Sequence, residues 1–129
     1  MTGRRRISSG GPWEAAASYS RAIAVGDACW VSGTTDAGSG GRSRHPGDVA
    51  AQARASFGIC RTALEAAGFA WSDVVRTRMF VVDVADADRV AAVHGELFAD
   101  IRPAATLLVV AALMDPSLLV EVEVEARRE

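Results

Sequence analysis

The chain has 129 residues, half of them hydrophobic, and a formal net charge of −2 at pH 7. This length predicts one globular domain over residues 1–129, for which oligomerisation would add useful burial. The balanced charge and the lack of a basic stripe exclude the usual electrostatic footprint of a nucleic-acid-binding protein. The absence of lysine excludes a Schiff-base mechanism and a lysine-anchored pyridoxal cofactor, and we predict no cofactor.

The hydrophobic residues are spread along the chain rather than gathered into one segment. No apolar run reaches 18 residues, and the arginines at positions 4–6 are not followed by an apolar stretch. We therefore expect no membrane partner, no secretion signal and a cytoplasmic protein.

The first third of the chain predicts an arm followed by a hairpin. Residues 1–18 are rich in Gly, Ser and Ala and are expected to form an N-terminal arm or entry loop, with Trp13 folded over a cleft or an interface or else loosely packed. Residues 19–25 and 28–32 read as two strands joined by the tight turn Gly26-Asp27. The glycine-rich stretch 36–46 reads as a loop.

The remaining elements alternate between helices and strands. Asp48 is a predicted N-cap for a helix that runs to residue 67 and stops at Gly68. Further elements are a strand at 74–82, a helix at 86–98 and closing strands at 104–112 and 118–126. The resulting order, ββαβαββ, predicts an α+β domain with two helices on one face of a sheet.

The cysteines and histidines give no metal-binding pattern. Cys29 and Cys60 are far apart in apolar runs, which favours small buried side chains over a disulfide or a metal pair. His45 and His94 lack ligand spacing, so each is interpreted as a solvent or cleft-rim histidine. No metal is predicted.

Several sequence blocks over about residues 17–127 together resemble one family. They include Val31-Ser32-Gly33, Ala51-Gln52-Ala53-Arg54, Phe80-Val81-Val82-Asp83 and Arg102-Pro103-Ala104. This combination resembles the Rid/YjgF family of reactive-intermediate (imine) deaminases, formerly called endoribonuclease L-PSP. The resemblance implies a homotrimer of the chorismate-mutase-like fold, with small-molecule clefts between subunits.

The last strand carries the first candidate site residue. Alternation places Val120, Val122 and Val124 on one face and Glu121, Glu123 and Glu125 on the other. By resemblance, Glu121 positions the hydrolytic water; the alternative is a solvated or ion-paired glutamate. Glu123 and Glu125 are expected to be structural, with Arg76 and Arg78 as their partners.

Two further positions are implied by the resemblance. Tyr19 corresponds to a tyrosine that lines the cleft, and Ser32-Gly33 to a pair whose backbone amide helps hold a carboxylate or water. For Tyr19 the alternative is an edge-strand aromatic with its hydroxyl in water. We take Glu121 and Tyr19 as the candidate catalytic residues.

The chain departs from the family pattern at Ala105, where a carboxylate-binding arginine is expected. Ala105, Leu107 and Val109 share a face of their strand that the resemblance directs into the cleft, so an apolar wall is expected there. Arg102 or Arg78 would have to replace the missing guanidinium, unless the ligand has no carboxylate. The candidate substrate-binding residues are Trp13, Ser32, Gly33, Arg102, Ala105, Thr106 and Leu107.

Three functions follow from these observations. The first is an enzyme that hydrolytically deaminates or tautomerises a small reactive enamine, imine or related compound. The alternative is a ligand-binding or scavenging trimer without efficient chemistry. An endoribonuclease is the weakest interpretation, because RNA cleavage requires a general acid, a general base and phosphate contacts.

Overall fold

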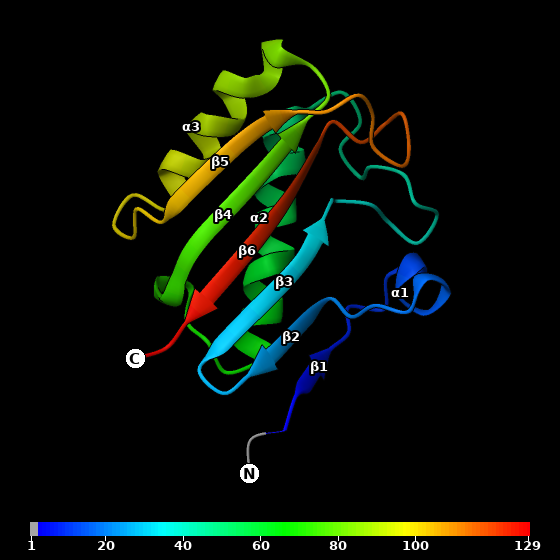
Figure 1. Ribbon diagram of the computed structural model, residues 1–129. Coiled ribbons are helices and arrows are strands. Elements are labelled where there is room, and N and C mark those ends of the chain that lie inside the picture. The colour runs from blue at the N-terminus through cyan, green and yellow to red at the C-terminus, as the bar shows by residue number, and fades with distance from the viewer. Residues whose placement is uncertain (1–2) are drawn as a thin grey trace.

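The computed structural model describes residues 3–129, which form a six-stranded mixed sheet in the order β1-β2-β3-β6-β4-β5 (Figure 1). All neighbouring strands are antiparallel except β4 and β5, which are parallel. The strands are β1 (Arg5–Ile7), β2 (Ala22–Val25), β3 (Ala28–Thr34), β4 (Val74–Val81), β5 (Ala104–Val109) and β6 (Val120–Arg127). The helices are α1 (Pro12–Ala17), α2 (Val49–Ala66) and α3 (Ala87–Leu97), with short 3-10 turns η1 (Trp71–Asp73) and η2 (Val84–Asp86).

Helices α2 and α3 cover one face of the sheet, and the other face is open, as Figure 1 shows. This arrangement confirms the predicted α+β class and the ββαβαββ order of the main elements. The arm was not expected to hold regular structure, yet it contributes the edge strand β1 and the short helix α1 beside it. The sheet therefore has one strand more than the sequence pattern predicts.

Local signals at the two ends of α2 explain its bounds. The Asp48 side chain accepts a hydrogen bond from the Ala51 amide (3.0 Å), which satisfies one of the free N–H groups of the first turn. Gly68 follows the helix with a φ of +87°, a conformation that favours glycine and ends the helix. The face between them buries apolar residues, including Phe57 and Leu64, in the core.

The final strand, β6, lies in the middle of the sheet between β3 and β4. Val120, Val122 and Val124 are buried in the core below the helices, as their alternation predicts. Arg78 pairs with Glu125 (2.7 Å) and with Glu123 (3.5 Å) on the open face, which confirms the expected ion pairs for this arginine. Arg76 instead donates to the Thr106 hydroxyl (2.6 Å).

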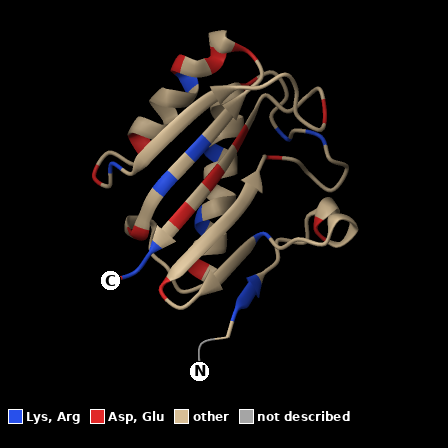
Figure 2. Ribbon diagram, viewed as in Figure 1, with Lys and Arg blue, Asp and Glu red and all other residues tan. Residues whose placement is uncertain are grey.

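Residues of opposite charge therefore lie next to one another on the neighbouring strands β4 and β6, as Figure 2 shows. The two cysteines are free and buried, in agreement with their interpretation as small core residues. Within residues 3–129, no helix has the length and hydrophobicity needed to cross a membrane. His94 is half-buried rather than exposed and contacts the Thr77 hydroxyl through Nε2 at 2.7 Å.

Candidate functional site

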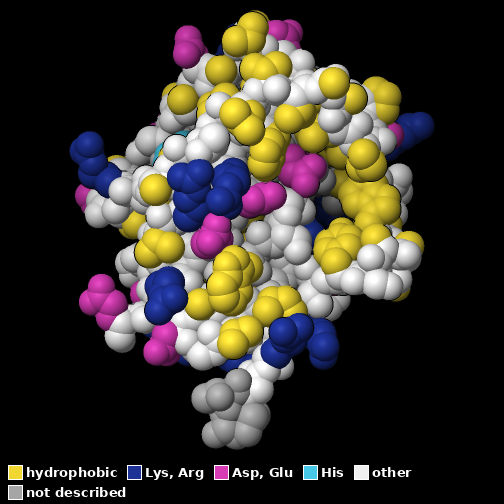
Figure 3. All heavy atoms as spheres, viewed as in Figure 1, with side chains coloured by type: hydrophobic (Ala, Val, Ile, Leu, Met, Phe, Trp, Pro, Cys, Tyr) yellow, Lys and Arg dark blue, Asp and Glu magenta, His cyan; other side chains and the backbone are white. Residues whose placement is uncertain are grey.

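A cavity of about 280 Å³ lies at the end of the sheet where β3 finishes and the chain enters β6. We call it the Glu121 cavity. Figure 3 shows a hollow on this side of the open face, bordered by hydrophobic side chains and by acidic ones. Its lining combines the arm, the end of β3, the loop before β6 and β6 itself: Trp13, Ala17, Tyr19, Arg21, Gly33, Thr35, Met114, Leu118 and Glu121.

Glu121 is the acidic group of this cavity, and Gly33 makes room for it. The Glu121 carboxylate lies over Gly33, so that a β-carbon at position 33 would come within 3.2 Å of Glu121 Cδ and still nearer to Oε2. Burial raises the pKa of Glu121, and the charge of Glu123 adds to this effect, while Arg21 opposes it. A carboxylate with a raised pKa is a stronger proton acceptor when it is ionised.

Tyr19 reaches the cavity because the arm folds back at the end of α1. Its backbone amide donates to the Glu14 carbonyl (3.0 Å), just after Ser18 adopts a left-handed conformation. The Arg21 guanidinium lies 5.6 Å from the centre of the Tyr19 ring, a cation–π distance. Tyr19 and Glu121 both line the Glu121 cavity.

The arm is held in place by Glu14. Its carboxylate accepts hydrogen bonds from the Ser9 hydroxyl (2.6 Å), the Ser9 amide (3.1 Å) and the Gly11 amide (3.2 Å). Burial favours the neutral acid, but these bonds outweigh it and lower the pKa of Glu14. Trp13, which precedes Glu14 in α1, lies against Gly41. A β-carbon on Gly41 would be 3.3 Å from the indole ring of Trp13.

Ser32 does not line the cavity, although it neighbours Gly33. Its amide donates to the Arg21 carbonyl (2.9 Å), and its hydroxyl donates to the Ser20 carbonyl (2.6 Å). Both groups hold β3 against the segment before β2. Of the Ser32-Gly33 pair, Gly33 is therefore the residue that borders the cavity.

The β5 candidates lie elsewhere in the chain. Ala105 pairs with Thr77 and Leu107 with Met79, two residues buried on the helix side of the sheet, and Leu107 itself packs against the core. Paired residues share a face, so Ala105 and Leu107 lie on the opposite face from Glu121. Within one chain, Ala105 and Leu107 therefore do not line the Glu121 cavity, and their place in a cleft between subunits stays a prediction.

Arg102 and Thr106 are also outside the cavity. Arg102 is exposed in the connection between α3 and β5, with a positive φ of 52°, and its amide donates to the Phe98 carbonyl (2.9 Å). Thr106 lies on the open face but accepts from Arg76. Since Arg78 is engaged by Glu123 and Glu125, neither arginine expected to replace the missing guanidinium borders Glu121.

Arg21 borders Glu121 instead, and sequence reasoning missed it. The residue is 8% exposed and lines the Glu121 cavity together with two neighbouring cavities. One of these, of about 470 Å³, lies under the arm and also includes Trp13, Tyr19 and His45. His45 is held there by the buried Asp36, whose Oδ2 lies 3.0 Å from His45 Nδ1. No local pattern marks an arginine before a strand as buried, so no sequence signal was available.

The geometry thus brings together a half-buried carboxylate, a phenol and a buried guanidinium around a small space. Such a set can bind a small polar molecule, accept a proton and stabilise negative charge. Among residues 3–129, no group of His, Cys, Asp and Glu side chains has an arrangement that could hold a metal ion.

Comparison with known proteins gives consistent matches over nearly the whole chain. The family model Endoribonuclease L-PSP matches residues 11–128. The uncharacterized protein SCO2049 of Streptomyces coelicolor is 42% identical over 124 residues, which cover 96% of this chain and 92% of that protein.

Two solved structures show the same fold. Rv2704 of Mycobacterium tuberculosis, described as a member of the YjgF/YER057c/UK114 family, has a TM-score of 0.88 and 40% identity, covering 98% of this chain and all of that one (100%). The YjgF gene product of Escherichia coli has a TM-score of 0.82 and 31% identity, covering 97% of this chain and 99% of that one.

Proposed function

Since the chain belongs to the Endoribonuclease L-PSP family, which includes the YjgF proteins, we propose that the Glu121 cavity hydrolyses a small reactive imine or enamine. The observation that carries this proposal is the position of Glu121, a half-buried carboxylate of raised pKa that borders a small cavity together with Tyr19. A lone surface glutamate would show neither the burial nor the shift.

The proposed reaction adds water across the carbon–nitrogen double bond. Glu121 accepts a proton from a water molecule as its oxygen bonds to the imine carbon, and the π electrons of the C=N bond move to nitrogen. Tyr19, whose hydroxyl is a donor, supplies a hydrogen bond to the polar end of the substrate. Nitrogen takes the water-derived proton from Glu121, which gives a neutral carbinolamine and an ionised Glu121. The carbinolamine hydroxyl then passes its proton through Glu121 to nitrogen, the C–N bond breaks, and ammonia and a carbonyl product leave with Glu121 ionised again.

We further propose that the working form is a homotrimer with the cavity at a subunit boundary. The open face of the sheet carries large exposed hydrophobic side chains, among them Trp30 (46% exposed), which pairs with Glu125, and Leu108 (49% exposed), which pairs with Phe80. An uncovered sheet face with such side chains is typical of an interface between protein chains. In a trimer, β5 of a neighbouring chain would supply the wall that Ala105, Thr106 and Leu107 were expected to form.

A second function fits the same cavity. Trp13, Ala17, Met114 and Leu118 give it largely apolar walls, which favour retention of a small hydrophobic molecule. A ligand-binding or scavenging trimer would use this site without turnover. The two functions differ in one measurable respect: the enzyme consumes an imine, whereas the binding protein does not.

The test uses imines formed in situ by an oxidase in the presence of catalase. An amino acid oxidase supplies imines that carry a carboxylate, and an amine oxidase supplies imines without one. We expect the protein to shorten the lifetime of at least one class, measured as loss of semicarbazide-trapped imine with matching ammonia release. Unchanged lifetimes for both classes, with saturable binding of the carbonyl products, would favour the ligand-binding function instead.

A further inference from the structure

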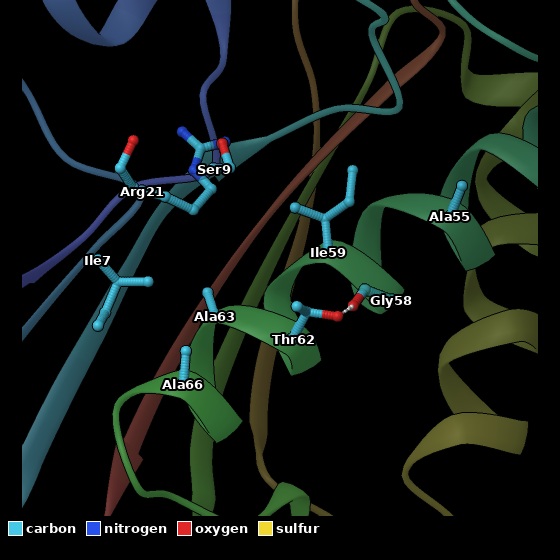
Figure 4. A pocket seen from close by; sticks show the side chains of 10 residues that line it. Ile7, Ser9, Arg21, Ala55, Gly58, Ile59, Thr62, Ala63 and Ala66 are labelled. Atoms are coloured by element: carbon cyan, nitrogen blue, oxygen red, sulfur yellow. Dashed lines mark hydrogen bonds between the residues drawn. The ribbon is translucent and has the colours of Figure 1, made fainter.

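Arg21 is the only buried arginine in residues 3–129. It precedes β2, and its side chain passes between the arm and α2, where Figure 4 shows it beside Ser9 and across from Ile59. One terminal nitrogen, Nη1, donates to the Thr34 hydroxyl (3.2 Å). The other two nitrogens, Nε and Nη2, are buried and have no hydrogen-bond partner.

A buried guanidinium without a counter-charge is costly, because it has lost its water and gained no anion. Asp36 and Glu121 line cavities together with Arg21, but neither forms an ion pair with it within 4.0 Å. The positive charge of Arg21 acts on Glu121 only through space, where it lowers the pKa of the carboxyl. The positive charge of Arg21 is therefore uncompensated where it lies.

The two free nitrogens have a specific geometry. Nε and Nη2 form one edge of the planar guanidinium, from which two parallel N–H bonds point in the same direction. This edge matches the two oxygens of a carboxylate, which it can bind in bidentate fashion. Nη1 lies outside this edge and donates to Thr34. The Nε and Nη2 edge therefore stays without a hydrogen-bond partner.

Accepting the proposed function of the Glu121 cavity, we propose that Arg21 is its anion-binding residue and that it receives a carboxylate through Nε and Nη2. Arg21 thus takes the part expected of an arginine at position 105. Arg78 is occupied by Glu123 and Glu125, and Arg102 is exposed at the opposite end of the sheet. Nε and Nη2 are closed to solvent in this conformation, so binding requires the guanidinium or the side chains over it to move.

The test observes Arg21 directly in the wild-type protein. Protein with ¹⁵N-labelled arginine is titrated with acetate at constant ionic strength, and the arginine Nε–H signals are recorded by NMR. We expect one signal, missing from Arg21→Lys and Arg21→Gln, to shift saturably. If the Arg21 signal stays unchanged while acetate is raised to high concentration, the proposal is wrong.

A parallel titration with inorganic phosphate separates a planar from a tetrahedral anion. We expect a weaker response to phosphate; an equal or stronger saturable response would overturn the assignment to a carboxylate. Acetate binding is then compared in folded variants by chemical shifts of neighbouring backbone amides. Arg21→Gln should bind acetate about 10- to 100-fold more weakly, because two charged hydrogen bonds are lost.

Arg44→Gln is the matched control. Arg44 is an exposed arginine that lines the cavity under the arm, so its loss removes the same charge nearby without touching the proposed contact. Its acetate affinity should stay within about twofold of wild type; an equal loss in both variants would mean general electrostatic attraction and would overturn the Arg21 contact.

These readouts need no turnover. Hydrolysis without acetate binding at Arg21 would contradict this inference alone, whereas acetate binding without hydrolysis of any imine would contradict the proposed reaction alone.

Discussion

The carboxylate of Glu121 occupies the space where a β-carbon on Gly33 would lie. Gly33 does not have a positive φ, so its backbone would accept another residue, and the requirement for glycine comes from the side chain of Glu121. Because the clashing atoms belong to the flexible end of a glutamate, a substitution at position 33 displaces the carboxylate rather than the strand.

We expect Gly33→Ala to keep its free energy of unfolding within about 1 kcal/mol of wild type, since a methyl group is accommodated by moving one side chain. Imine hydrolysis should fall about 10²-fold, because a displaced base no longer meets the water. Gly40→Ala is the control, as no atom lies within 4 Å of a β-carbon there. Full activity of Gly33→Ala would mean that the position of Glu121 does not matter.

The ionised form of Glu121 should lower the free energy of unfolding at neutral pH. Its folded-state pKa is raised above the usual 4.5, mainly by burial, so the folded protein prefers the neutral acid. Protonated Glu121 therefore stabilises the folded protein. This contribution is fully present below about pH 4.5 and is lost as the pH rises through the raised pKa. We expect Glu121→Gln to have a higher Tm than wild type at pH 8 and a similar Tm at pH 4, measured by calorimetry. A lower Tm for the variant at pH 8 would instead identify Glu121 as an ion-pair partner.

Much of the fold follows from local patterns in the sequence. The cap at Asp48, the stop at Gly68 and the alternation of Val and Glu along β6 each act through neighbours in the chain, so they were predictable. Helix α1 and strand β1 could not be predicted from local patterns. The arm has no hydrophobic periodicity of its own, and its structure depends on Glu14 and on pairing with β2.

The site was predictable only in part, for a related reason. Resemblance identified Glu121, Tyr19 and Gly33, and the size of an aromatic side chain on the arm indicated Trp13. All four residues line one cavity. Alternation shows which β5 residues share a face, but not which face meets the helices, and the pairing with β4 places Ala105 and Leu107 on the helix side. Arg21 donates to Thr34 and shares a cavity with residues of α2, segments far from it in the sequence that no local pattern relates to it.

His94 gives the fold a second pH dependence, away from the site. It packs between Phe57 and Phe98, and burial lowers its pKa below the usual 6.5. A depressed histidine pKa contributes stability that is present above about pH 6.5 and is lost as the pH falls through the folded-state pKa. The free energy of unfolding from urea titrations should therefore decrease between pH 7 and pH 5.

The control is His94→Gln, which should be less stable at every pH because it loses aromatic packing, but should lose less stability over that interval. Equal decreases in wild type and His94→Gln would assign the pH dependence to other groups.

The proposed trimer predicts a mass of three times 13.5 kDa by light scattering at micromolar concentration. Trp30→Glu places a charge on the open face of the sheet and should shift the protein toward monomer. Val84→Glu, at an exposed hydrophobic residue of η2 outside the sheet, should leave the mass unchanged. A wild-type monomer would contradict the proposal.

The most direct test of the central claim is the rate of imine hydrolysis by Glu121→Gln. Glutamine keeps the shape of glutamate but cannot accept a proton, so the rate with whichever imine wild type consumes should fall by roughly 10² or more while the fold is retained. Glu125→Gln changes a glutamate on the same face of β6, one that pairs with Arg78, and should retain most of the wild-type rate. A Glu121→Gln protein that is folded and fully active would show that Glu121 is not the base.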